Sequence, residues 1–211
     1  MKKYQAGMLL TIGTLALIVS GIQPADRTIW ILVVLPIFIG VPILIATYNR
    51  FPLTPLAYWL VLVYALIMML GGHYEWSQVP LGFWLQDLLD LSRSPYDRLG
   101  HFTQGFMPAI LVREILLRRS PLVRSKWLVF LVTAVCLAIS ACYEFTEWWA
   151  AVVMGESAEA FLGFRGDIWD TQWDMFLSLI GAVSAQLLLV SWHDRQLDQL
   201  VTSSVAGRSA A

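Results

Sequence analysis

An aspartate and a histidine stand four residues apart at the start of a long apolar segment, within Ser94-Pro-Tyr-Asp-Arg-Leu-Gly-His-Phe-Thr-Gln-Gly-Phe-Met-Pro108. A helix that begins near Asp97 places the carboxylate of Asp97 and the imidazole of His101 on one face. These two groups can bind a metal ion or exchange protons, provided that they are held close together. The spacing therefore identifies the first part of a candidate site.

Two later stretches supply further carboxylates. Glu144 and Glu147 are three residues apart in one apolar segment, and Asp167, Asp170 and Asp174 begin the next. Each set repeats at the 3.6-residue period of a helix and so occupies one side of it. Because a charge that faces hydrocarbon costs about 2.5 to 3.5 kcal/mol, we expect the charged sides of the three helices to face one another.

Carboxylates gathered in a poorly solvated place repel one another unless a cation lies among them. An oxygen-rich set with one imidazole suits Mg²⁺, Mn²⁺, Ca²⁺ or, less well, Zn²⁺. The predicted metal ligands are Asp97, His101, Glu144, Asp170 and Asp174. The predicted acid/base groups are His101, Glu147 and Asp167. Arg98 and Arg165 are predicted to bind an anionic head group.

Structural roles for the same residues stay open. Asp97 can cap the fourth helix and Asp167 or Asp170 the sixth, because acids are favoured at helix N-termini, and His101 can be a hydrogen-bonded structural histidine. Capping does not account for Glu144, because it stands near the end of its helix, where the dipole disfavours anions. A salt bridge to Arg98 or Arg165 would account for it.

The composition is that of a membrane protein. Of the 211 residues, 58% are apolar and 14% are charged, whereas in soluble domains roughly half are apolar and about a quarter charged. The net charge of -1 offers no basic surface, so we expect no nucleic-acid partner. Six apolar runs approach the length of a membrane span. They cover about residues 6–22, 28–47, 53–72, 97–117, 127–149 and 173–192.

The pattern predicts an all-α fold, a six-helix polytopic membrane bundle that forms a single domain over residues 1–193. Between the third and fourth spans, Leu81, Trp84 and Leu88 recur at helical spacing. This indicates an amphipathic segment that lies in the membrane interface. The polar tail, residues 194–211, is predicted to be disordered.

The basic residues predict the orientation of the six spans. With an even number of spans both termini lie on one side, and that side carries ten of the fourteen Lys and Arg residues. The positive-inside rule therefore places both termini in the cytoplasm. The ten are Lys2, Lys3, Arg50, Arg113, Arg118, Arg119, Arg124, Lys126, Arg195 and Arg208. The acid and histidine site then faces the periplasm.

The three polar motifs resemble those of a known family, the YjdF-type bacterial inner-membrane proteins of uncharacterised function, from the second span to the sixth. The motifs are Asp97-Arg-Leu-Gly-His101-Phe, Tyr143-Glu144-Phe-Thr-Glu147 and Arg165-Gly-Asp167-Ile-Trp-Asp170-Thr-Gln-Trp-Asp174. Over the last three spans they also resemble a diverged VanZ-like pattern, with Arg98 in place of its lysine and Ser178 in place of its asparagine. The first resemblance implies a multi-pass membrane protein. The second implies an association with glycopeptide-antibiotic resistance and the envelope, and neither implies an established reaction.

We therefore expect a multi-pass inner-membrane protein whose periplasmic site acts, with a divalent metal ion, on an envelope lipid or a lipid-linked substrate. Membrane lipids are its expected partners. One alternative is a small transporter or cation-binding protein that uses the same acids as a pathway. Another is a structural membrane protein in which the acids form a network with arginines. Whether the protein is an enzyme, and its oligomeric state, stay open at this point.

Overall fold

A computed structural model of the chain describes residues 3–154 and 168–209. Within these ranges every regular element is helical, which confirms the predicted all-α fold. The helices are α1 (Lys3–Ser20), α2 (Arg27–Thr47), α3 (Pro55–Tyr74), the 3-10 turn η1 (Trp76–Gln78), α4 (Pro80–Leu88), α5 (Tyr96–Arg119), α6 (Lys126–Met154) and α8 (Asp170–Ser209). Except at the end of α8, their bounds lie within a few residues of the predicted ranges.

Five helices in the described ranges are long and apolar enough to cross a membrane, namely α1, α2, α3, α6 and α8. This confirms a multi-pass membrane protein. The sequence predicted six spans, and α5 is the difference. With 24 residues α5 is long enough, but its charged and other polar side chains make it less apolar than the other five long helices, so it does not qualify by composition.

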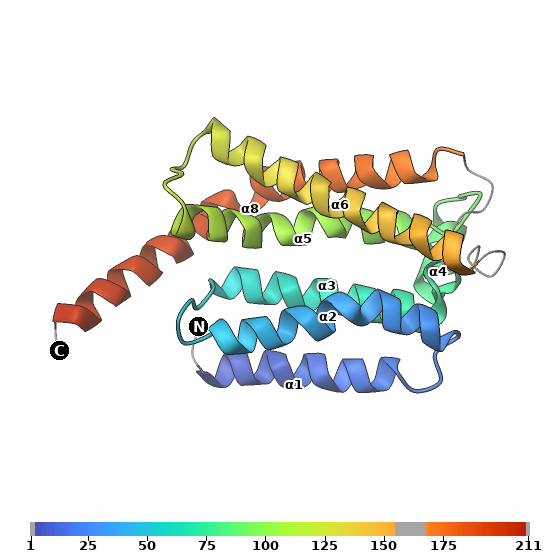
Figure 1. The fold of residues 1–211 in the computed structure, drawn as a ribbon, viewed down its shortest axis with the longest axis horizontal. Helices are drawn as coiled ribbons and strands as arrows, with labels where there is room; N and C mark the ends of the chain where they lie inside the picture. The colour runs from blue at the N-terminus through green and yellow to red at the C-terminus, as the bar shows by residue number, and fades with distance from the viewer. Residues whose placement is uncertain (1–2, 155–167, 210–211) are drawn as a thin grey trace.

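The long helices form two groups (Figure 1), with α1, α2 and α3 on one side and α5, α6 and α8 on the other. The two groups are joined mainly through α3, which packs against α1, α2 and α5. The most extensive contact in the described chain is between α5 and α8. The short helix α4 lies across one end of the bundle (Figure 1).

Glycines bring α5 and α8 together. A Cβ atom at Gly105 would lie 1.8 Å from the carbonyl oxygen of Ser178, and one at Gly181 would lie 2.1 Å from the carbonyl oxygen of Phe102. Small residues allow membrane helices to pack backbone against backbone in this way. As a result, the first turns of α5 and α8, which carry two of the predicted acidic motifs, lie side by side.

The indole of Trp76 fixes α5 against α3 at the same end of the bundle. A Cβ atom at Gly71 of α3 would lie 2.7 Å from this ring, and one at Gly100 of α5 would lie 2.6 Å from it. The hydroxyl of Tyr96 donates a hydrogen bond of 3.1 Å to the carbonyl oxygen of Ile67. The first turn of α5 is therefore held from two sides.

The predicted amphipathic segment corresponds to η1 and α4. The side chains of Leu81, Trp84 and Leu88 are 44%, 60% and 63% exposed, so this short helix presents a row of uncovered apolar groups. Gly82 faces the protein instead, because a Cβ atom there would lie 2.1 Å from the hydroxyl oxygen of Ser94.

The last helix extends beyond the predicted end of the sixth span. It does not end near residue 192 but continues as α8 to Ser209. The physical reason is that polar side chains of the extension bind other elements. Asp194 pairs with Arg113 at 2.7 Å, Gln196 accepts a hydrogen bond of 2.9 Å from the backbone N–H of Leu56, and Leu197 is buried.

Candidate functional site

His101 lies at the centre of the predicted site, between two aspartates. Its Nε2 atom is 3.7 Å from Oδ1 of Asp97, one turn earlier on α5, and 3.7 Å from Oδ2 of Asp174 on α8. His101 and Asp174 are buried and Asp97 is half-buried. One potential ligand atom from each of the three residues lies within 4.8 Å of the others. This separation is compatible with a single metal ion held among them.

Glu144 lies on the other side of the imidazole. Its Oε1 atom is 3.7 Å from Nδ1 of His101, and its side chain is buried. The ring of Tyr143 stands edge-on to the imidazole, with 6.0 Å between the ring centroids. Three helices, α5, α6 and α8, therefore each direct one buried ionisable group toward the same place, as predicted from their periodicity.

Several buried polar atoms of the site have no hydrogen-bond partner within the described chain. Beside the imidazole they are His101 Nδ1, Glu144 Oε1 and Asp174 Oδ1. About one turn deeper on the same helices they are Gln104 Oε1, Ser140 Oγ and Ser178 Oγ. Buried polar atoms are normally paired, and water or an ion accounts for many exceptions. Their concentration around His101 indicates that a ligand, an ion or water completes the site.

Asp170 does not join His101 in this arrangement. Its Oδ1 atom accepts a hydrogen bond of 2.8 Å from the guanidinium of Arg93, and this pair is also an ion pair. Asp170 is 5% exposed, whereas the side chain of Arg93 is 23% exposed. Arg93 was not among the site residues predicted from the sequence. The available signal was only its position just before α5, among the few basic residues predicted to lie outside.

The remaining predicted site residues have different positions. Glu147 is half-buried one turn beyond Glu144 on α6 and is not part of the group of ligand atoms around His101. The guanidinium carbon of Arg98 lies 5.9 Å from the centroid of the Trp173 ring. Arg165 and Asp167 lie outside the described residues. Asp97 lies in the first turn of α5. The N-cap residue of α5 is Pro95, which makes no side-chain capping bond.

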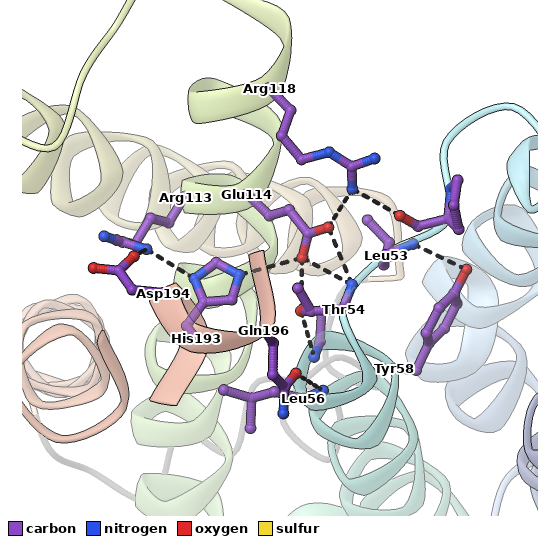
Figure 2. Close-up of polar contacts among 12 residues, drawn as sticks. Leu53, Thr54, Leu56, Tyr58, Arg113, Glu114, Arg118, His193, Asp194 and Gln196 are labelled. Atoms are coloured by element: carbon purple, nitrogen blue, oxygen red, sulfur yellow. Dashed lines mark hydrogen bonds and ion pairs between the residues drawn. The ribbon is translucent and has the colours of Figure 1, made fainter. Parts of the chain in front are cut away.

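A second buried polar cluster lies at the other end of α5, around Glu114 (Figure 2), and the sequence analysis did not predict it. The Glu114 carboxylate accepts bonds of 3.1 Å from the backbone N–H of Thr54 and 2.7 Å from its hydroxyl. Arg118 donates to the same carboxylate and to the carbonyl oxygen of Pro52. We call these residues, together with Arg113 and His193, the Glu114 network.

The geometry of the Glu114 network fixes the proton on His193. Arg113 can only donate, and its guanidinium nitrogen is 2.9 Å from Nδ1 of His193, so Nδ1 accepts. The proton then sits on Nε2, which is 3.2 Å from Glu114 and donates to it. His193 and Glu114 are both fully buried. Because this carboxylate and this imidazole are fully bonded, the network is a structural tie between α3, α5 and α8.

The fold and the site together define a multi-pass α-helical membrane protein with a buried acid and histidine cluster at one end. A family model described as "Predicted membrane protein (DUF2238)" matches residues 6–195, and the chain belongs to this family. The chain is also 51% identical over 184 residues to "Inner membrane protein YjdF" of Escherichia coli (strain K12), a match that covers 87% of this chain and 88% of the relative.

No solved structure matches this chain. The family match and the relative together confirm the YjdF-type resemblance of the motifs. They do not show the VanZ-like resemblance, which stays a prediction.

Proposed function

We propose that this protein is an enzyme of the bacterial inner membrane that binds a divalent cation through Asp97, His101 and Asp174 and acts on an envelope lipid or lipid-linked substrate. The observation that carries this proposal is the group of three ligand atoms, within 4.8 Å of one another, on two different helices. The name of the Escherichia coli relative supports the inner-membrane location.

Two carboxylates and an imidazole suit the predicted cations, Mg²⁺, Mn²⁺, Ca²⁺ or Zn²⁺. Three protein ligands would leave coordination positions for water and for a substrate oxygen. A cation bound there would polarise a phosphoryl or carbonyl oxygen, or acidify a bound water. Asp97 and Asp174 would bind it through the oxygens that now face Nε2 of His101.

For Glu144 the proposed role differs from the predicted role of metal ligand. Since it lies on the Nδ1 side of His101, it is placed to accept the Nδ1 proton and so to orient the ring, leaving Nε2 for the cation. Carboxylates commonly support metal-bound histidines in this way. Glu144 would thus be a positioning residue, and Asp170 would act through its pair with Arg93 instead of as a ligand.

The arginines near the acids of the site support an anionic substrate. Arg93 is partly exposed and its guanidinium lies 2.8 Å from Asp170, which places a positive charge beside the acids of the site. Arg98 lies nearby, in the first turn of α5. A guanidinium can bind phosphate or carboxylate oxygens in a bidentate manner. Arg165 retains its predicted role as a further head-group ligand.

We also propose that α5 is the sixth membrane span. Its 24 residues would extend about 36 Å, which exceeds the roughly 30 Å of hydrocarbon. Its charged residues can be accommodated because α3, α6 and α8 pack around it. With six spans and the predicted distribution of basic residues, both termini would be cytoplasmic and the site periplasmic. The exposed apolar side chains of α4 would then lie in the periplasmic interface.

A cation or proton pathway is the rival function, and the packing between the two polar clusters disfavours it. The polar residues near His101 are separated from the Glu114 network by tightly packed apolar side chains. This apolar cluster contains Ala109, Leu128, Val132, Cys136, Ala182 and Ala185, each at most 1% exposed. A pathway along α5 and α8 would have to cross this apolar cluster, beside which Gln186 donates a hydrogen bond of 3.0 Å to Thr133, whereas an enzyme site needs access from one end only.

The proposal is tested first by measuring cation binding. Detergent-purified protein would be titrated calorimetrically with Mg²⁺, Mn²⁺, Ca²⁺ and Zn²⁺, in the parent, in Asp174→Asn and in Asp198→Asn. Asp198 is a matched control, since it is a carboxylate of the same helix that is 65% exposed at the other end. We expect one bound cation per chain, lost in Asp174→Asn only. Absence of binding by all four ions would contradict the proposal.

The reaction is tested separately. Parent protein and Asp174→Asn would be incubated with inner-membrane lipid extract and the preferred cation, and the lipids compared by mass spectrometry. We expect a change in a head group that depends on both the cation and Asp174. If the protein binds the cation but forms no lipid product, it is a cation-binding protein and the proposed enzymatic activity is wrong.

A further inference from the structure

Arg119 differs from the arginines that surround it at the C-terminal end of α5. Three neighbours form ion pairs, namely Arg113 with Asp194, Arg118 with Glu114 and Arg124 with Asp198. No carboxylate of the described chain pairs with Arg119. Its guanidinium carbon lies 4.7 Å from the centroid of the Phe51 ring, and the side chain is exposed. Its positive charge therefore remains available to a ligand.

Arg119 stands at one end of an apolar groove of about 510 Å³ between α2, α3 and α5. Near Arg119 the groove is lined by Thr47, Phe51 and Leu53, and its far end is formed by Pro36, Met68 and Met107. Almost all of its lining side chains are apolar. Arg119 is the charged residue of this lining.

The groove has the length of one membrane leaflet. Met107 and Arg119 mark its ends on α5 and lie about 18 Å apart along the helix axis. The hydrocarbon of a bilayer is about 30 Å thick, so this is close to half of it. Two of the three walls, α2 and α3, are helices long and apolar enough to span the membrane. The groove therefore lies at the depth of the acyl chains of one leaflet.

We infer that this groove binds one acyl chain of an anionic phospholipid, whose phosphate rests on Arg119. An apolar slot of leaflet length with a single cation at its surface end matches the two parts of such a lipid. Neutralising a negative head group there is favourable, because each basic residue near a membrane surface contributes about 1 kcal/mol toward anionic lipids. A lipid without net charge gains little from this contact.

This lipid site is independent of the proposed enzyme site. Arg119 ends α5, whereas His101 and Asp97 lie in its first two turns. No acid of the cluster around His101 lines the groove. An anionic lipid bound at Arg119 would therefore lie in one leaflet, and the proposed substrate would lie in the other.

The head-group contact is tested with purified protein by native mass spectrometry, titrating phosphatidylglycerol and phosphatidylethanolamine. We expect the parent to prefer phosphatidylglycerol and Arg119→Gln to bind it about fivefold more weakly. Arg50→Gln is the matched control, because Arg50 is an exposed arginine near the same end that does not line the groove. We expect Arg50→Gln to bind like the parent.

The acyl-chain contact is tested by filling the groove. A Cβ atom at Gly40 meets nothing within 4 Å, so Gly40→Leu can place its side chain in the slot. Gly7 is equally open but lines a different groove, so Gly7→Leu is the control. We expect weaker phosphatidylglycerol binding in Gly40→Leu alone. Equal binding of the two lipids by the parent, or unchanged binding in Arg119→Gln, would overturn the inference.

Discussion

Gly105 of α5 lies so close to Ser178 of α8 that a Cβ atom added to it would come within 1.8 Å of the Ser178 carbonyl oxygen. This backbone contact sits one turn below the acids. It places Nε2 of His101 on α5 at 3.7 Å from Oδ2 of Asp174 on α8, although these two helices are far apart in the sequence. The proposed cation site therefore depends on a glycine that would never contact the cation.

Gly105→Ala should destabilise the protein, although alanine normally favours a helix. The added methyl group has no space and must push α5 away from α8, and such overpacking costs about 1 to 3 kcal/mol. Thermal unfolding in detergent would show a lower midpoint than in the parent. Gly7→Ala is the control, because Gly7 has open space around it. Equal midpoints for the two variants would mean that α5 and α8 do not touch at Gly105.

Glu144→Gln should weaken cation binding without abolishing it. If Glu144 orients His101 from the Nδ1 side, its loss should lower cation affinity about 10- to 100-fold. Asp174→Asn, which removes a proposed ligand, should leave no measurable binding. Isothermal titration of both variants would separate the two roles. Complete loss of binding in Glu144→Gln, with the fold intact, would instead make Glu144 a ligand, as the sequence analysis predicted.

Arg93→Gln should strengthen cation binding. The substitution leaves the negative charge of the buried Asp170 without its guanidinium partner near the site, and the attraction of this charge for a bound cation would contribute about 1 kcal/mol. An increase in cation affinity of up to about fivefold would follow. Arg93→Gln combined with Asp170→Asn cancels the charge change and should restore the parent affinity. A decrease in Arg93→Gln would indicate that Arg93 supports the site by packing instead.

Glu114→Ala should be among the most destabilising single substitutions in this chain. It leaves Arg118 unpaired, removes the acceptor for the Thr54 backbone N–H and frees the Nε2 proton of His193. Breaking a buried ion pair from one side costs about 3 to 5 kcal/mol. Denaturant unfolding in mixed micelles would measure it.

Asp198→Ala provides the comparison for Glu114→Ala, since it breaks the Arg124 pair at an exposed position. Its cost should lie between about 0 and 1 kcal/mol. Similar losses of stability in the two variants would mean that the Glu114 network does not tie α3, α5 and α8 together.

Local pattern was sufficient to predict the helices and their polar faces. The i,i+4 pair Asp97 and His101, and the position of Glu144 on a separate apolar helix, predicted that these side chains would converge, and in the structure they do. The reason is that a charged side chain in a membrane bundle is costly when it faces lipid, so it faces other polar groups inside the bundle.

Pairing between distant elements could not be predicted in the same way. Arg93 precedes α5 by a few residues and still binds Asp170 in α8, and His193, at the predicted end of the membrane domain, binds Glu114 in α5. The partners of these side chains are 77 and 79 positions away along the chain, on other elements. Periodicity within one helix contains no information about them.

The sequence by itself determined that the chain is a bundle of membrane helices with acids and a histidine near one end, because composition and helical period act within each segment. Only the tertiary structure decided which nitrogen of His101 faces the two aspartates and which faces Glu144. It also decided that Asp170 belongs to Arg93 and that Glu114 is buried. These outcomes depend on how closely backbones approach at positions such as Gly105, and that approach is set by three-dimensional packing.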